Sequence, residues 1–162
     1  MAPLEFDPIE RAGELWEERI GDATAMRLVT SLMRAQQLVL TRLEAALRPL
    51  GITFARYEVL RLLSFSRTGS LPLSRIGERL MVHPTSVTNA IDRLVAQGLV
   101  SREVDEADRR RVLASLTPEG EKVLEVATDT LVNLGFGVDA LTPAQQREAY
   151  ALLRVLRSAD WS

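Results

Sequence analysis

The sequence contains no cysteine, and among its 162 residues there is a single histidine, His83, and a single lysine, Lys122. Without thiols the chain cannot form disulfides, zinc ribbons or a cysteine nucleophile. One histidine excludes sites built from several histidines, and it leaves any acid–base triad dependent on His83. We therefore predict a protein that uses no metal and no other cofactor.

Long apolar runs are also absent, and no stretch reaches the roughly 20 residues needed to span a bilayer. The first residues, MAPLEFDPIERAGELWEERIG, lack the basic-then-apolar order of a signal peptide. A hydrophobic content of 46% with 26% charged residues is typical of a soluble globular chain, here one domain or a domain with helical extensions. We expect a cytoplasmic protein with no membrane partner.

Two helices are predicted at the start of the chain, over residues 8–20 and 23–48. The second contains neither glycine nor proline. One of its apolar stripes runs from Met26 to Leu47 with a spacing close to a heptad seam, and a second stripe lies on another side. A helix that is apolar on two sides needs partners on both. A central core helix and a dimerisation helix fit this pattern equally well.

The rest of the chain has the order of elements typical of a winged helix-turn-helix followed by two helices. We expect a helix over 53–65 with Thr53 as its N-cap, a turn with one short strand within 66–73, a helix over 74–81, a helix over 84–97 capped by His83, strands over 99–104 and 111–116 in an antiparallel hairpin, and helices over 118–134 and 143–158 that each begin with Thr-Pro. The predicted fold class is α+β and mainly helical, a winged helix-turn-helix with long N-terminal and C-terminal helices.

The predicted helix over 84–97 has two different faces. Its buried stripe is expected to consist of Val87, Ile91, Leu94 and Val95. The opposite side carries Thr85, Ser86, Asn89 and Arg93, flanked by Thr88 and Asp92. These residue types read base edges and phosphates in the major groove, and they cluster at the end that a recognition helix inserts. The alternative is an ordinary solvated face, although such faces usually carry more Glu and Lys.

Three consecutive arginines, Arg109, Arg110 and Arg111, stand between the two predicted strands of a chain whose net charge is −2. Residues 70–120 carry seven Arg and seven acids, so any nucleic-acid footprint rests on where the charges lie. At the tip of a hairpin these guanidinium groups could reach the minor groove. Asp108 could hold one of them in a bidentate pair.

The segment over 71–120, LPLSRIGERLMVHPTSVTNAIDRLVAQGLVSREVDEADRRRVLASLTPEG, resembles the winged-helix core of the MarR family of bacterial transcription regulators. The most diagnostic parts are VTNAIDRLVAQGLV, the DRR at 108–110 and LTPEG. The resemblance covers nearly the whole chain, because that family also has a long first helix and two terminal helices. It implies a homodimer that binds double-stranded operator DNA and is not an enzyme. Residues 1–50 would serve dimerisation and form a wall of the ligand pocket, 51–117 would bind DNA, and 118–162 would complete the dimer.

The resemblance also assigns roles to individual residues. It implies base reading by Ser86, Thr88, Asn89 and Arg93, a minor-groove contact by Arg110 with Asp108 as its partner, and phosphate contacts by Arg109 and Arg111. It further implies a repressor that a small molecule, commonly aromatic or carboxylate-bearing, releases from a pseudo-palindromic operator.

Similar proteins place the effector between the long helix, the next helix and the winged helix. The candidate ligand-binding residues here are Trp16, Arg27, Arg34, Gln37, Tyr57, Glu58 and His83. The extra N-terminal helix is similar to a urate-responsive branch, which has an aspartate and an arginine where this chain has Glu58 and Ala90. A branch that responds to tricarboxylates such as trans-aconitate is at least as similar, through SLMRAQQ, FARYE and VHPTSVTN.

Other interpretations of these residues remain open. Trp16 fits a core or interface anchor, Arg27 and Arg34 fit solvated charges, and His83 fits a helix cap or a phosphate contact. Two rival functional classes also exist. An enzyme would need a nucleophile, a base and an orienting group, and no such set is apparent. A winged-helix protein acting through a protein partner, without a small-molecule effector, would bind DNA with little dependence on salt.

Overall fold

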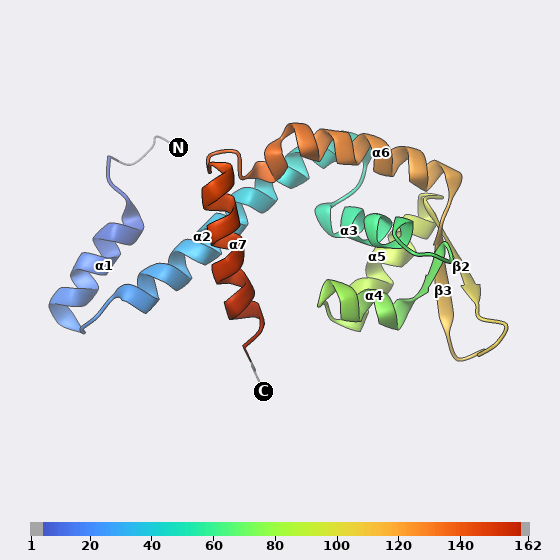
Figure 1. The fold of residues 1–162 in the computed structure, drawn as a ribbon, viewed down its shortest axis with the longest axis horizontal. Coiled ribbons are helices and arrows are strands. Elements are labelled where there is room, and N and C mark those ends of the chain that lie inside the picture. Colours follow the sequence, from blue (N-terminus) through green and yellow to red (C-terminus); the bar gives the residue numbers. More distant parts are fainter. Residues whose placement is uncertain (1–4, 160–162) are drawn as a thin grey trace. The chain divides into compact units, whose positions relative to one another are not determined.

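The fold is known from a computed structural model that describes residues 5–159. Within those residues no helix is both long and apolar enough to cross a membrane. The chain divides into two compact units, residues 1–42 and residues 43–162. They are described one at a time, since their relative placement is not determined (Figure 1).

The first unit consists of α1 (Pro8–Arg19) and most of α2 (Thr24–Leu47). Asp7 caps α1 by accepting a hydrogen bond from the backbone N–H of Ile9 at 2.8 Å. The two helices are joined by Arg27, whose guanidinium lies 2.5 Å from Glu17 and 3.6 Å from Glu10. Gly13 makes this contact possible, because a Cβ there would lie 2.1 Å from Nε of Arg27.

The second unit contains the last turn of α2 and all later elements. In chain order these are η1 (Arg48–Leu50), α3 (Phe54–Ser64), β1 (Ser70–Pro72), α4 (Leu73–Leu80), α5 (Pro84–Ala96), β2 (Val100–Val104), β3 (Val112–Leu116), α6 (Pro118–Asn133), η2 (Gly135–Gly137) and α7 (Pro143–Arg157). Each predicted helix and strand is present, with ends that differ by a few residues at most, and the short strand expected within 66–73 is β1. The predicted mainly helical α+β fold is therefore confirmed.

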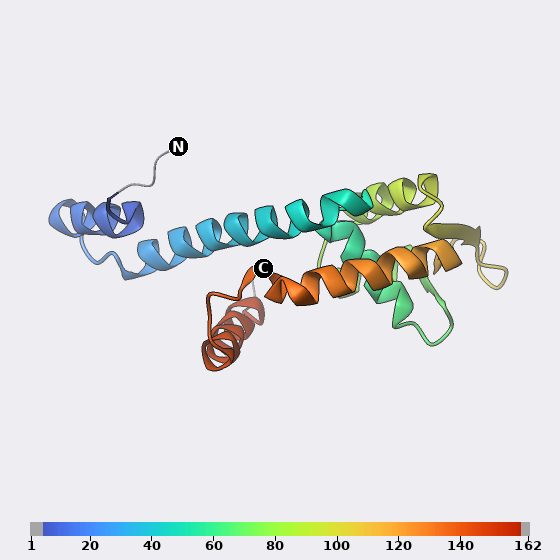
Figure 2. The same cartoon turned by 90° about the horizontal axis from the view of Figure 1, so that it is seen from above.

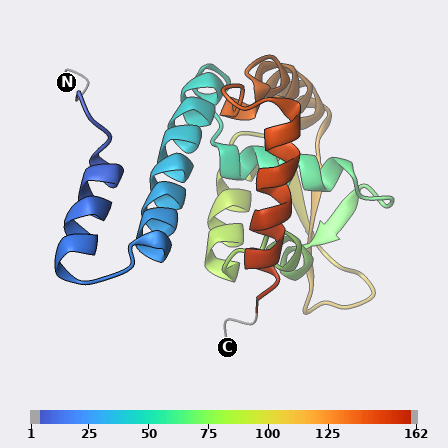
Figure 3. The same cartoon turned by 60° about the vertical axis from the view of Figure 1, so that its left-hand side comes forward.

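The strands form one antiparallel sheet in the order β1-β3-β2. The hairpin pairs Val104 with Val112 and Val100 with Leu116, so its connecting loop spans residues 105–111. β1, the green arrow in Figure 3, adds to the free edge of β3. Helix α6 leaves the end of β3 and packs across α3 (Figure 2).

The core of this unit is aliphatic. Its most buried large side chains are Leu47, Leu60, Leu63, Ile76, Ile91, Leu94 and Leu131. They come from α2 to α6, so burial of a single cluster holds the helix-turn-helix against α6. The residues predicted to cap helices do so: the side chains of Thr53, His83, Thr117 and Thr142 each accept a backbone N–H from the first turn that follows.

The LTPEG motif fixes the start of α6 to the end of α5. Thr117 donates its hydroxyl to the carbonyl of Gly98 at 2.7 Å, and its backbone N–H to the carbonyl of Leu99 at 3.1 Å. One helical turn later, a Cβ on Gly120 would lie only 2.1 Å from that same Leu99 oxygen. Glycine is therefore required at position 120 for close approach of two backbones.

The joint between α6 and α7 is built from three consecutive residues with positive φ. Gly135 has φ 59°, Phe136 has φ 51° and Gly137 has φ 74°. Glycine accepts this left-handed conformation freely, whereas phenylalanine adopts it at a cost. The joint therefore places one aromatic side chain at a position where the backbone favours glycine.

Candidate nucleic-acid interface

Helix α5 presents the predicted polar face to solvent. Thr85, Ser86, Thr88, Asn89 and Arg93 are all exposed. On the other side Val87, Ile91 and Leu94 are at most 2% exposed. The prediction that Val95 belongs to this buried stripe is wrong, because its side chain is 39% exposed. Val95 lies in the last turn of α5, and the next buried side chains are those of Leu99 and Val100, beyond the end of the helix.

The N-terminus of α5 is organised by His83. Its Nδ1 accepts a hydrogen bond from the backbone N–H of Thr85 at 3.2 Å, and its carbonyl accepts one from Ser86 at 2.9 Å. An imidazole that accepts at Nδ1 carries its proton on Nε2, so Nε2 is the nitrogen that can donate a hydrogen bond. Thr88 donates its hydroxyl proton to the carbonyl of Pro84 at 3.2 Å, so its oxygen can only accept any further hydrogen bond.

One ion pair ties α5 to the wing. Asp92 on α5 accepts a hydrogen bond from Nη1 of Arg102 on β2 at 2.5 Å, and both side chains are about half exposed. Arg102 was not predicted from the sequence, since a lone arginine in a strand gives no signal of its own. The pair holds the exposed face of α5 beside the hairpin.

Acids shape the wing tip through the backbone. Asp105 accepts the N–H of Ala107 at 3.0 Å, and Asp108 accepts the N–H of Arg110 at 3.1 Å. The loop closes with hydrogen bonds between the backbones of Asp105 and Arg111 at 3.0 Å and of Arg111 and Asp108 at 2.8 Å. The carboxylate of Asp108 therefore binds the backbone N–H of Arg110. The sequence had instead suggested a bidentate pair between Asp108 and a guanidinium group.

The three arginines of the tip differ in their partners. Nε of Arg111 lies 3.7 Å from Asp105, so part of its charge is balanced. Within residues 5–159 neither Arg109 nor Arg110 has an ion pair, and both are exposed. Arg110 and Arg111 also line a hollow of about 220 Å³ with Ser74, at the start of α4.

A second polar hollow, of about 660 Å³, borders the recognition face. Arg56 and Thr53 from the start of α3 line it together with Asn89, Asp92 and Arg93 from α5. Arg56 was not singled out by the sequence, because on α3 alone it is an ordinary surface arginine. Its guanidinium hydrogen-bonds the carbonyl of Gly51 at 3.4 Å.

The candidate effector residues fall into separate places. Tyr57 is 6% exposed and Glu58 is adjacent to it; both line one cavity of about 380 Å³ in the second unit. Burial raises the pKa of the Glu58 carboxyl above its ordinary value. His83 caps α5 and does not line that cavity.

The remaining effector candidates belong to the first unit. The charge of Arg27 is balanced by Glu17 and Glu10, and hydrogen bonding to Glu17 raises its pKa further. Arg34 donates a hydrogen bond to Gln37 at 2.8 Å on the surface of α2. Trp16 is 37% exposed on α1.

Comparison with known proteins places the chain in a family. A sequence model of the MarR family matches residues 52–112, which hold the helix-turn-helix and the wing. Sco5413, a MarR family transcriptional regulator from Streptomyces coelicolor, is 50% identical, with 82% of this chain and 92% of that chain covered and a TM-score of 0.77. The chain belongs to the MarR family.

Other relatives of this MarR family chain are also regulators by name. FarR of Neisseria gonorrhoeae, an HTH-type transcriptional regulator, is 30% identical over 77% of this chain and 82% of FarR. YhbI of Bacillus subtilis is 36% identical over 59% of this chain and 61% of YhbI. The chain thus spans less than two thirds of YhbI, and its alignment with the repressor MdtR covers 44% of that protein. Membership of a family of transcriptional regulators supports the prediction that the chain is not an enzyme.

Proposed function

We propose that this MarR family chain is a homodimeric repressor that binds a pseudo-palindromic operator and leaves it when a small aromatic or anionic metabolite binds. One observation carries the DNA-binding part. The exposed hydrogen-bonding face of α5 is fixed beside the wing by the Asp92–Arg102 pair, and the wing tip bears Arg109 and Arg110 without ion pairs in the described residues.

In this proposal α5 enters the major groove and the wing follows the adjacent minor groove. Ser86, Thr88, Asn89 and Arg93 would read base edges, and Thr85 lies at the inserted end of α5. Arg110 would enter the minor groove while Arg109 and Arg111 contact phosphates. Structures of two relatives support DNA binding by the fold: Sco3205 of Streptomyces coelicolor was solved in complex with DNA, and a mutant of MarR from Escherichia coli was solved with operator DNA.

The dimer is proposed from apolar side chains that one chain leaves uncovered. On α2 Leu28 is 65% and Met33 is 54% exposed, and on α7 Leu152 is 68% and Val155 is 73% exposed. Exposed apolar side chains that gather on two helices are typical of an interface. In a dimer with a twofold axis, the two recognition helices would face two half-sites of the DNA. Of the two roles that fit the sequence of α2, dimerisation is therefore the one we propose. Segments 1–50 and 118–162 would form the dimer and 51–117 would bind DNA.

An effector is proposed by analogy with BpsR of Bordetella bronchiseptica, whose DNA binding is regulated by 6-hydroxynicotinic acid. The urate-type and tricarboxylate-type effectors suggested by the sequence are both anions. Arg27 is already paired with two carboxylates, so Arg34 and Gln37 are the better candidates for an anion in the first unit. Tyr57 and Glu58 line a cavity that suits an aromatic ring.

The DNA-binding part is tested by fluorescence anisotropy on the intergenic DNA upstream of the gene that encodes the chain. Arg110→Ala should weaken binding about tenfold and reduce the slope of log K against log salt by about 1. Asn89→Ala should relax the base preference at one position in each half-site. Arg67→Ala, an exposed arginine outside the interface, is the matched control.

If Arg110→Ala and Asn89→Ala bind with the same affinity, salt dependence and base preference as the unaltered protein and the Arg67→Ala control, the assignment of α5 and the wing to DNA is excluded. A DNA affinity that hardly changes with salt would favour the alternative in which the winged helix binds a protein partner. Half-sites are expected about one helical turn apart, roughly 10 bp between centres.

A further inference from the structure

The cavity beside Tyr57 gathers half of the aromatic residues of the chain. Its volume is about 380 Å³, within the range of small-molecule sites. The residues that line it are Phe54, Tyr57, Glu58, Arg61, Leu62, Phe65, Leu80 and Phe136. The sequence has only four Phe, two Tyr and two Trp, so four of eight aromatic residues meet at one place. Two of these rings, Phe65 and Phe136, are 72% and 38% exposed, so they are accessible to a ligand.

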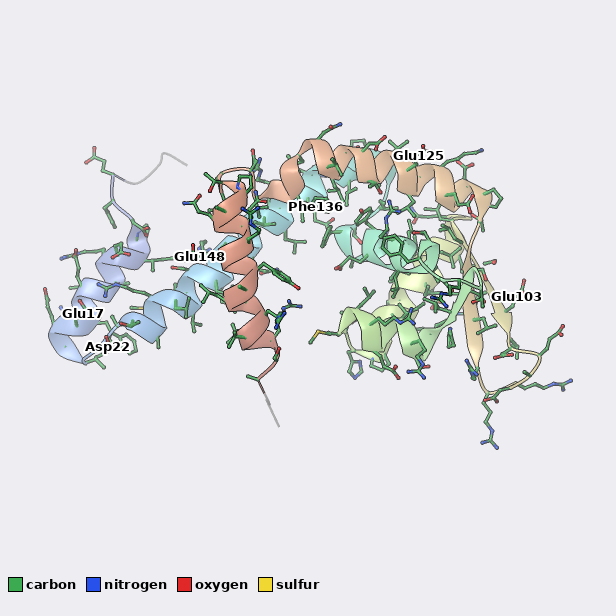
Figure 4. The ribbon with its side chains drawn as sticks, viewed as in Figure 1. Glu17, Asp22, Glu103, Glu125, Phe136 and Glu148 are labelled. Carbon is green, nitrogen blue, oxygen red and sulfur yellow. The ribbon has the colours of Figure 1, made fainter. Side chains whose placement is uncertain are left out.

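Three elements contribute these walls. The rings of Phe54 and Tyr57 on α3 stack with centroids 5.9 Å apart. Phe65 follows at the C-terminus of α3, and Leu80 comes from α4. Phe136, labelled in Figure 4, comes from the positive-φ joint between α6 and α7.

Glu58 is the only acid among the lining residues. Within residues 5–159 its carboxylate has no ion pair and no hydrogen bond. Glu58 is itself an exposed residue, and the partial desolvation of its carboxyl by the neighbouring side chains raises its pKa above the ordinary value. A positively charged group in the cavity would remove that penalty.

The one base of the cavity is already engaged. Arg61 donates a hydrogen bond to the hydroxyl of Thr128 on α6, and its guanidinium carbon lies 5.4 Å from the ring centroid of Phe65. This contact shows that the Phe65 ring presents its face to a cation in the structure itself. An anion entering the cavity would gain from Arg61 but would be repelled by the unpaired Glu58.

We propose that this cavity binds a compound that joins an aromatic ring to an ammonium group, with the ring against Phe54, Tyr57 and Phe136 and the ammonium against Glu58. Aromatic faces together with one carboxylate are the groups that recognise organic cations. The inference rests on the proposed function and narrows its effector, replacing the anionic alternative at this site.

The position of the cavity gives such a ligand a route to the DNA-binding unit. Leu80 ends α4, the first helix of the helix-turn-helix, and Phe136 lies at the base of α7. A ligand that touches both stabilises whichever spacing of α4 and η2 fits it best. It therefore changes DNA affinity only insofar as the DNA-bound form has a different spacing.

The experiment uses two probes that share a ring and differ in charge, (1-naphthylmethyl)trimethylammonium and naphthalene-1-methanesulfonate. Each is titrated into the full chain by isothermal calorimetry at pH 7.5, without DNA. The cation should bind at least about tenfold more tightly than the sulfonate. Glu58→Gln should abolish that preference. Glu103→Gln removes one carboxylate at the opposite end of the same unit (Figure 4) and should leave the preference unchanged.

Phe136→Leu should weaken both probes together, because it removes ring contact without changing charge. The inference is wrong if the sulfonate binds as tightly as the cation, if neither binds, or if Glu58→Gln keeps the preference for the cation. The proposed function is tested separately by adding the cation to the protein–DNA complex in the anisotropy assay. Binding that depends on Glu58 but releases no DNA would uphold the cation site and overturn ligand-relieved repression through it.

Discussion

Replacing Gly120 by alanine should destabilise the protein, although alanine is the better helix former. Position 120 lies in the first turn of α6, where intrinsic propensity favours alanine by about 1 kcal/mol. The new Cβ, however, would lie 2.1 Å from the carbonyl oxygen of Leu99, and this separation must grow to about 3 Å. The required shift strains the bonds from Thr117 to Gly98 and Leu99, each worth about 1 kcal/mol.

We expect a net loss of about 2–3 kcal/mol, which for a chain of this length lowers Tm by about 4–12 °C. Thermal unfolding followed by circular dichroism at fixed protein concentration measures it, since a dimer makes Tm depend on concentration. Gly13→Ala is the control, because its Cβ would displace only a side chain, that of Arg27, and so weaken the partly exposed ion pairs with Glu17 and Glu10 without moving a backbone. That variant should change stability by less than about 1 kcal/mol. A Gly120→Ala protein as stable as the parent would refute the close approach of α6 to Leu99.

Three further predictions concern caps and charges. Thr117→Val should cost about 1–2 kcal/mol in urea unfolding and Thr117→Ser much less, because only serine keeps the hydroxyl that serves both Gly98 and Gly120; equal losses would contradict this. Glu58→Gln should raise Tm at pH 7. The raised pKa of Glu58 makes stability fall as pH rises from its ordinary value of 4.5 through the folded value, so the gain should vanish at pH 4, and a gain independent of pH would exclude this cause. Asp92→Asn should steepen the salt dependence of DNA affinity, because it frees Arg102 to contact a phosphate. The control is Asp129→Asn, which removes an exposed acid on α6. Equal salt slopes for the two variants would show that the Asp92–Arg102 pair is distant from DNA.

Local sequence signals predicted the elements well because each end of a helix carries its own chemistry. Thr53, Thr117 and Thr142 stand directly before helices, and each side chain accepts a backbone N–H from the first turn; Gly98 follows the end of α5 with φ 72°. The polar face of α5 followed from a 3.6-residue period alone. The same period failed for Val95, because periodicity does not show where the neighbouring element stops covering a helix.

Contacts between distant positions were not accessible from the sequence. Nothing local relates Phe136 to Phe54, which are brought to one cavity by the packing of α6 on α3. The pair between Asp92 and Arg102 depends on the strand register of the wing, and the partner of Arg111 proved to be Asp105. Pairing of charges depends on ångström-scale geometry that composition does not encode.

The left-handed backbone of Phe136 has a consequence for how the chain tolerates change. A residue other than glycine in this conformation costs about 1–2 kcal/mol, so glycine at 136 would make the joint itself more stable. Glycine would also remove one wall of the aromatic cavity. Position 136 is therefore under two opposed physical demands, because glycine would relax the joint whereas phenylalanine supplies a wall of the cavity.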